Sequence, residues 1–318
     1  QTARRRPFSV KILALTGGVG GAKLALGLSQ CLAPDEVDFV VNTGDDFKHL
    51  GFHISPDIDT LTYTLGNVAN PETGWGRDDE TWNFMESLEA LGGDTWFKIG
   101  DRDLALHVFR QQQLESGKTL TEITKIITNQ LGIKSRVLPV SNDPVPTIVE
   151  TTEGPLPFQH YFVRDRCKPV VTGFQFSQVD KATLNPEIDF ETTDAVVICP
   201  SNPFVSVDPM LAIPGMRSAL HAFKGPIVAV SPIIGGAAIK GPTAKMMKEL
   251  KIPTTTVQVA KHYIGLINCF VIDQQDHSHR EAVKQLGLTT DVQQTVMVTL
   301  EDRIQLAKAV LDLVRNIR

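Results

Sequence analysis

The sequence has few cysteines, only a small excess of charge and no long uninterrupted apolar run. No Cys-x-x-Cys pair or Cys/His metal spacing is present, so no cysteine-based metal site is predicted. The four cysteines are expected to be reduced thiols in a cytoplasmic protein, and they are Cys31, Cys167, Cys199 and Cys269. The longest apolar candidate, residues 12–28, contains five glycines and Lys23, so no membrane span is predicted.

Charge and composition exclude two further classes of protein. Lys and Arg number 31 against 36 Asp and Glu, which gives a net charge of −5 and a pI near 5.9. Because there is no basic field to attract a phosphate backbone, a dedicated nucleic-acid-binding protein is not expected. The chain has 318 residues, of which 42% are hydrophobic. It is long enough for one large α/β domain or two modest ones, and disorder as its main state is excluded.

The segment before the first apolar run contains Arg4-Arg5-Arg6-Pro7 and resembles a twin-arginine export signal. Two observations favour a different interpretation. The residues that follow already have a complete strand, turn and helix pattern, and no small-residue cleavage site comes after them. We therefore expect a frayed terminal arm over residues 1–8 and a cytoplasmic location.

Apolar runs predict a parallel sheet of the nucleotide-binding type. Residues 11–16 (KILALT) suit a short buried strand, glycines follow, and residues 22–32 carry apolar side chains at helical spacing before a second strand at 37–42. This order is the opening of a Rossmann-like fold. Further strands are predicted at 195–199, 227–230 and 269–272, and a closing helix is predicted after Thr299.

The middle of the chain has a different pattern. Helices are predicted at 81–91, 104–114 and 120–131, whereas residues 136–176 are rich in β-type alternation. We therefore expect an α/β fold with a Rossmann-like core, a mostly parallel sheet flanked by helices, built from residues 9–70 and 191–318. Residues 71–190 are expected to form an inserted helical and β subdomain that covers the acceptor site.

The loop Thr16-Gly17-Gly18-Val19-Gly20-Gly21-Ala22-Lys23 lies between a predicted strand and helix, where backbone amides can face a phosphate. It is not a P-loop, because Ala22 and Leu24 replace the glycine and the Ser/Thr of that motif. Lys23 breaks the dinucleotide fingerprint, and the second strand ends at Asn42 instead of an acid, which disfavours an NAD oxidoreductase. A structural alternative stays open, in which the glycines only let helix and strand approach closely.

Four carboxylates, Asp45, Asp46, Asp57 and Asp59, fall within fifteen residues on loops expected at the carboxyl ends of strands. A loop that returns on itself can bring Asp45 and Asp57 to one hard cation, with water and substrate phosphate completing the coordination, as Mg²⁺ is usually held. The alternative is helix capping, for which Asp57 or Asp59 is well placed before an apolar helical pattern. The two roles can coexist on different aspartates.

Together these motifs resemble one family, the 2-phospho-L-lactate transferases of coenzyme F420 biosynthesis. The resemblance covers nearly the whole chain from Lys11. It rests on GGVGGAK at 17–23, VVNTGDD at 40–46, ISPDIDTLTYTL at 54–65, WG at 75–76, KIGDRDLA at 98–105, SNDPVPTIVETTEG at 141–154, SNPFVS at 201–206, PGMR at 214–217 and VSPIIGGAAIKGP at 230–242. Nucleotide-sugar-binding proteins that share the glycine loop should lack the GDRDLA and SPIIGG segments, and this chain has both.

The resemblance implies a Mg²⁺-dependent enzyme that transfers a phosphoester unit from a guanosine diphosphate-linked donor, such as LPPG, to the ribityl hydroxyl of the deazaflavin Fo and releases GMP. Asp45 and Asp57 would hold the metal, and Asp59 and Lys98 would contact Fo. Asp59 is expected to orient the hydroxyl, since an ordinary aspartate is a weak base at neutral pH. A homodimer is also implied. The GDP moiety would lie against Gly17, Gly18, Gly20, Gly21, Ser201, Asn202, Ser231 and Gly235.

Several alternatives stay open at this point. The donor's acid can be phospholactate, phosphoenolpyruvate or 3-phosphoglycerate, which differ by a few atoms. A non-enzymatic nucleotide- or nucleotide-sugar-binding regulator of the same fold is the alternative function. The GDRD acids Asp101 and Asp103 can be structural or reacting groups, and Trp75, Trp82 and Trp96 can flank a flat ring or belong to the core.

Overall fold

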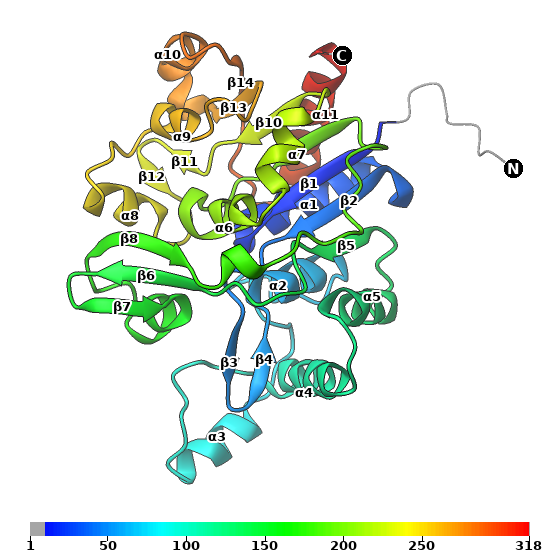
Figure 1. Cartoon of the computed structure of the whole chain (residues 1–318), viewed down its shortest axis with the longest axis vertical. Helices are drawn as coiled ribbons and strands as arrows, with labels where there is room; N and C mark the ends of the chain where they lie inside the picture. The colour runs from blue at the N-terminus through cyan, green and yellow to red at the C-terminus, as the bar shows by residue number, and fades with distance from the viewer. Residues whose placement is uncertain (1–9, 318) are drawn as a thin grey trace, which may run out of the picture.

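A parallel seven-stranded sheet, in the order β14–β13–β10–β9–β1–β2–β5, forms the centre of the computed structural model (Figure 1). The structure describes residues 10–317, so the expected arm at residues 1–8 lies outside the described part. Neighbouring strands are parallel throughout the sheet. The strands are β1 (Ile12–Thr16), β2 (Val37–Val41), β5 (Arg136–Pro139), β9 (Ala195–Ile198), β10 (Ile227–Val230), β13 (Cys269–Asp273) and β14 (Thr289–Gln293). The expected Rossmann-like α/β class is confirmed.

The five strands expected from apolar runs are all present, each within one residue of its expected bounds. They are buried along their whole length because helices cover both faces of a parallel sheet, which is why they read as continuous apolar runs. Two further strands were not foreseen in this sheet. β14 is polar (TTDVQ) and lies at one edge, and β5 lies at the other edge, paired with β2.

Helices cover the two faces of the sheet. One face packs against α1 (Gly18–Cys31), α2 (Pro56–Leu65), α5 (Leu120–Gln130) and α11 (Leu300–Ile317). The other face packs against α6 (Asp208–Ala212), α7 (Met216–Ala222), α8 (Thr243–Glu249), α9 (Thr256–His262) and α10 (Arg280–Lys284). α1 begins four residues earlier than its apolar pattern, because the glycines themselves form its first turn.

Residues 71–190 supply α3 (Asn83–Ala90), α4 (Asp101–Glu115), α5 and a three-stranded antiparallel sheet of β7 (Gly154–Pro157), β6 (Thr147–Thr151) and β8 (Val171–Phe176). They also supply β5, so this segment contributes a strand to the central sheet. α3 and α4 pack with the hairpin of β3 (Phe47–His49) and β4 (Phe52–Ile54), which follows the carboxyl end of β2 (Figure 1). This arrangement places α4 beside the acidic loop.

Short elements complete the chain. The loop after β9 continues into η4 (Pro203–Val207), a π-helical segment, and a second π-helical segment, η2, covers His160–Arg164. A small hairpin of β11 (Ile233–Ile234) and β12 (Ala237–Ala238) follows β10. Within residues 10–317, no helix combines the length and apolar character needed to cross a membrane.

Candidate functional site

Three loops meet at the carboxyl edge of the central strands. β1 leads into Gly17 and the N-terminus of α1, β2 leads into residues 42–46, and β9 leads into residues 200–202. β1 lies between β2 and β9, and the order of strands along the chain reverses there. Ligands of parallel α/β proteins bind in the crevice outside such a reversal.

Asn42 brings Asp45 and Asp57 together. Its Nδ2 donates to Asp45 Oδ1 at 3.1 Å and to Asp57 Oδ2 at 2.9 Å, so both carboxylates lie one hydrogen bond from the same nitrogen atom. Asp57, on the first turn of α2, also accepts from the Gly18 amide at 2.8 Å through Oδ1. All three side chains are buried. The structure thus brings the loop after β2 next to the first turn of α2, where Asp57 lies instead of on the loop expected from the sequence.

Burial and mutual repulsion oppose ionisation of this pair. Loss of solvation, followed by the charges of Asp57 and Asp46, raises the pKa of Asp45 well above its usual value. Loss of solvation raises the pKa of Asp57 to about 6, although hydrogen bonds from Asn42 and Gly18 oppose the rise. A hard divalent cation fits this donor set, because it would neutralise two adjacent carboxylates and leave its other positions to water and substrate oxygens.

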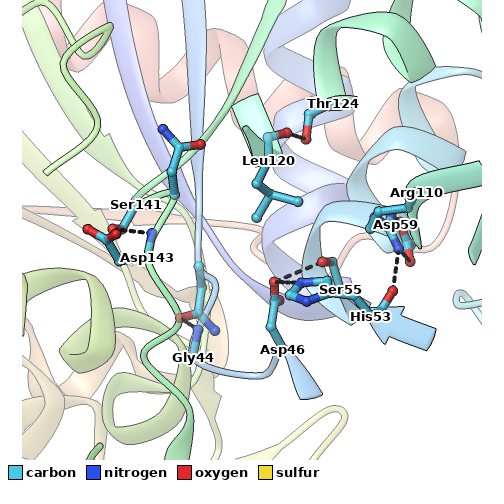
Figure 2. Close-up of polar contacts among 12 residues, drawn as sticks. Gly44, Asp46, His53, Ser55, Asp59, Arg110, Leu120, Thr124, Ser141 and Asp143 are labelled. Carbon is cyan, nitrogen blue, oxygen red and sulfur yellow. Dashed lines mark hydrogen bonds and ion pairs between the residues drawn. The ribbon is translucent and has the colours of Figure 1, made fainter. Parts of the chain in front are cut away.

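Asp46 is turned toward different partners. Its Oδ2 lies 3.0 Å from His53 Nε2 and accepts a hydrogen bond from Ser55 Oγ at 2.8 Å (Figure 2). These contacts tie the loop after β2 to β4 and to the residue before α2. Asp46 therefore fixes the position of the acidic loop, while its neighbour Asp45 faces Asp57.

Asp59 is held by a buried arginine from α4. Arg110 Nη1 donates to Asp59 Oδ2 at 3.1 Å and Nη2 donates to Oδ1, while Nη1 also donates to the His53 carbonyl at 3.4 Å (Figure 2). Burial lowers the pKa of Arg110, but the Asp59 carboxylate more than offsets this effect and the net pKa is raised. Asp59 therefore has a permanent cationic partner. It lies two residues from Asp57, whose hydrogen-bond partners within residues 10–317 are the neutral Asn42 side chain and the Gly18 amide.

The Arg110 contact continues into a buried polar network. His107 Nδ1 lies 3.3 Å from Arg110 Nη1, and His107 Nε2 lies 3.2 Å from Asp103 Oδ2. Tyr63 donates to Asp103 Oδ1 at 2.5 Å. Asp59, Asp103 and His107 are the one group of three in residues 10–317 whose potential metal-ligand atoms all lie within 4.8 Å of one another. Since Arg110 already supplies a cation there, this group is better described as a charge network than as a metal site.

The glycine loop packs tightly against the other two loops. The Gly17 amide donates to Ser201 Oγ at 3.3 Å, and the Gly18 amide donates to Asp57. A Cβ on Gly17 would lie 2.9 Å from Asp57 Oδ2, and a Cβ on Gly21 would lie 2.8 Å from Ser201 Oγ. Close approach to α2 and to the loop after β9 is therefore a sufficient reason for glycine at these two positions. The N-terminus of α1 still faces the site, so its backbone amides can also bind a phosphate.

Gly20 and Asn202 fix the loop after β9. A Cβ on Gly20 would lie 2.6 Å from the Pro200 carbonyl oxygen, so α1 packs directly against this backbone. Asn202 Oδ1 accepts hydrogen bonds from the amides of Phe204 and Val205 and thereby caps η4. The oxygen of Asn202 is engaged in shaping the loop.

Ser231 and Gly235 lie in the turn after β10. Ser231 Oγ donates to the Ile233 carbonyl at 2.9 Å and accepts from Thr256 Oγ1 at 2.8 Å. Gly235 has a φ of +56° and its amide donates to Asp276 Oδ2 at 3.0 Å. The contacts of both residues thus stabilise this turn and the adjacent α9 region.

Lys98 is exposed in the segment before α4. Its neighbour Phe97 packs against Trp96, with ring centroids 5.8 Å apart, so this tryptophan belongs to an aromatic cluster, whereas Trp75 is 51% exposed. Asp101 accepts hydrogen bonds from residues 81–84, which lower its pKa to about 2. Asp101 therefore organises the start of α3, and Asp103 belongs to the network around Arg110.

Sequence reasoning did not single out Asn42, Arg110 or His107 as site residues. Arg110 and His107 carried a usable signal, because the spacing of Asp103, His107 and Arg110 places all three on one face of α4. Asn42 carried a positional signal, since it directly follows β2 at the edge where ligands bind.

Comparisons with known proteins identify the family of this chain. Residues 12–312 match the model of the family described as 2-phospho-L-lactate transferase CofD. A 2-phospho-L-lactate transferase of Methanosarcina mazei is 36% identical over 302 residues, covering 94% of this chain and 99% of that protein. A phosphoenolpyruvate transferase of Kitasatospora aureofaciens is 35% identical over 318 residues, covering 97% of this chain and 99% of that protein.

Solved structures support the fold. A protein of the upf0052 family from Bacillus halodurans superposes with a TM-score of 0.62 at 14% identity, covering 96% of this chain and 100% of that one.

The family model matches almost the entire described chain, and the relatives match over nearly their full lengths. This chain therefore belongs to the 2-phospho-L-lactate transferase family of enzymes.

Proposed function

We propose that this enzyme is a Mg²⁺-dependent transferase of coenzyme F420 biosynthesis. It moves a phospho-acid unit from a GDP-linked donor to the ribityl hydroxyl of Fo and releases GMP. The observation that carries the proposal is the pair of buried carboxylates, Asp45 and Asp57, joined by hydrogen bonds from one Asn42 nitrogen beside the N-terminus of α1. Family membership supplies the reaction class.

The reaction makes one bond and breaks one. The ribityl oxygen attacks the phosphorus that carries the acid, and the bond from that phosphorus to the bridging oxygen breaks, so that oxygen leaves with GMP. The hydroxyl proton is released to solvent. Such transfers need in-line positioning and neutralisation of charge on the phosphoryl oxygens. When bound, Mg²⁺ would supply part of that neutralisation.

Each part of the site has a defined task in this proposal. Asp45 and Asp57 hold the metal, and the α1 N-terminus faces the diphosphate of the donor. Asp59 accepts a hydrogen bond from the attacking hydroxyl and orients it. Both oxygens of Asp59 already accept from Arg110, so taking up the hydroxyl proton would disrupt this ion pair, which favours orientation over general-base catalysis. Lys98 contacts Fo from the exposed segment before α4.

A product assay tests this proposal. The purified enzyme is incubated with Mg²⁺, Fo and the guanylylated forms of phospholactate, phosphoenolpyruvate and 3-phosphoglycerate together, and the products are measured by mass spectrometry. The expected result is GMP and a deazaflavin product heavier by one phospho-acid unit, and its mass identifies the acid. Absence of every such product, with the donors intact, would refute the proposed reaction.

A further inference from the structure

The Asn42 side chain has four hydrogen-bond contacts, which join three segments of the site. Its Nδ2 carries two hydrogens and lies within hydrogen-bond distance of three acceptors, Asp57 at 2.9 Å, Asp45 at 3.1 Å and the Val205 carbonyl in η4 at 3.2 Å, so one hydrogen is shared between two of them. Its Oδ1 accepts from the Gly44 amide at 2.8 Å. The side chain is completely buried. One carboxamide thus connects the loop after β2, the first turn of α2 and the segment after β9.

The carboxamide of Asn42 is chemically suited to hold two carboxylates close together. An asparagine amide is neutral and donates two hydrogens, so it attracts both carboxylates without competing for a cation. The bond from Gly44 fixes which way the carboxamide points, because the oxygen must face the amide and the nitrogen must then face the acids. An aspartate here would repel both neighbours, and an aliphatic residue would leave them without a shared donor.

We propose that Asn42 is a positioning residue that sets the separation of Asp45 and Asp57 and thereby the affinity of the site for a divalent cation. This inference rests on the metal site of the proposed function. Groups that orient metal ligands through hydrogen bonds typically contribute about 10- to 100-fold to metal affinity. Asn42 acts on the cation only through the two acids, so its loss should weaken cation binding without removing a ligand.

Asn185 provides a matched control. It is also buried, its Nδ2 donates to Thr121 Oγ1 and to the Pro139 carbonyl, both at 2.8 Å, and its Oδ1 accepts from the Glu187 amide at 3.0 Å. Its backbone amide donates to the carbonyl of Val140, so Asn185 lies beside the residue that comes directly after the edge strand β5. Replacing it removes a similar set of hydrogen bonds without touching either acid.

The test measures Mn²⁺ binding by electron paramagnetic resonance, which needs no substrate and no turnover. We expect Asn42→Ala to raise the dissociation constant by about 10-fold or more, whereas Asn185→Ala should leave it within about twofold of the wild-type value. If Asn42→Ala does not fold, Asn42→Thr keeps one hydroxyl donor and should give a smaller but clear weakening.

The variants Asp45→Asn and Asp57→Asn separate the two ways in which the account can fail. If both aspartate variants lose Mn²⁺ binding while the folded Asn42 variants bind as the wild type does, the positioning role of Asn42 is wrong and the metal site stands. If both aspartate variants also bind Mn²⁺ normally, the metal site of the proposed function is wrong and the inference falls with it.

Discussion

Arg110 Nη1 lies 3.1 Å from Asp59 Oδ2 and ties α4 to the first turn of α2. Both side chains are buried, and the second guanidinium nitrogen binds the other carboxylate oxygen. The two acids of α2, Asp57 and Asp59, therefore differ in the charge of their neighbours. Arg110 neutralises the charge of Asp59, whereas Asp57 lies beside a second acid, Asp45. This difference underlies the first prediction.

Replacing Arg110 by methionine should destabilise the protein strongly, because it leaves the Asp59 carboxylate buried without a partner. We expect a loss of about 3–5 kcal/mol in the free energy of unfolding, measured by urea denaturation. Adding Asp59→Asn to this variant should restore part of the loss. Arg315→Met, which breaks an exposed pair with Asp312, should change stability by no more than about 0.5 kcal/mol. An Arg110→Met protein as stable as the wild type would contradict the account.

Replacing Asp45 by asparagine should stabilise the metal-free protein and remove its response to Mg²⁺. The substitution removes one of two adjacent buried charges and keeps an oxygen for Asn42, so we expect a rise of about 2 °C in the melting temperature at pH 8 without metal. Addition of Mg²⁺ should then have no effect, and transfer activity should fall by at least about 100-fold, or about 2.7 kcal/mol in the barrier.

Asp38→Asn is the control for that experiment. Asp38 is a buried acid at the opposite end of β2, but it pairs with Lys11 at 2.8 Å and with Arg136 at 3.3 Å. Its loss should lower the melting temperature and leave the Mg²⁺-induced rise intact. If Asp45→Asn keeps the Mg²⁺-induced rise, Asp45 is not a ligand.

The response to Mg²⁺ should depend on pH. The pKa of Asp57 is about 6 in the folded protein, above its ordinary value of 3.8, so between about pH 4 and 6 the folded state binds a proton that the unfolded chain has lost. This group therefore makes the metal-free protein less stable as the pH rises through that window. Cation binding needs both carboxylates ionised, and the pKa of Asp45 is raised as well, so the Mg²⁺-induced rise in melting temperature should be small at pH 5 and should grow as the pH rises to 8.

Replacing Gly17 by alanine should weaken cation binding. The added Cβ would lie 2.7 Å from Ser206 Cβ and 2.9 Å from Asp57 Oδ2, so Asp57 must move. Gly27→Ala is the control, since its Cβ would collide with the Arg303 carbonyl oxygen where α1 packs on α11, and its nearest neighbours include neither Asp45 nor Asp57. Both variants should lose about 1–3 kcal/mol of stability. Only Gly17→Ala should raise the Mn²⁺ dissociation constant; equal constants for the two variants would contradict this assignment.

The central strands could be predicted from the sequence because both faces of the sheet are buried, which makes each strand a continuous apolar run. β14 could not, since an edge strand with the sequence TTDVQ lacks that pattern. β5 was visible as part of a β-rich region, but its pairing with β2 depends on how residues 71–190 pack. Pairing is a tertiary property that periodicity does not encode.

The residues of the site also differ in how far the sequence could place them. Asp45 and Asp57 could be placed near one another because parallel strands end at one edge of a sheet, although Asp57 lies on the first turn of α2 and not on a loop. The partner of Asp59 could not be found, because Arg110 lies 51 residues away on a helix whose direction is set by packing. The role of Asn42 was also hidden, since a carboxamide after a strand has many possible partners.

The most direct test of the central claim is an anomalous difference map from crystals of this protein grown with Mn²⁺. The account predicts one strong peak about 2.1 Å from carboxylate oxygens of both Asp45 and Asp57. A peak bound instead by Asp59, Asp103 and His107, or no peak between Asp45 and Asp57, would contradict it.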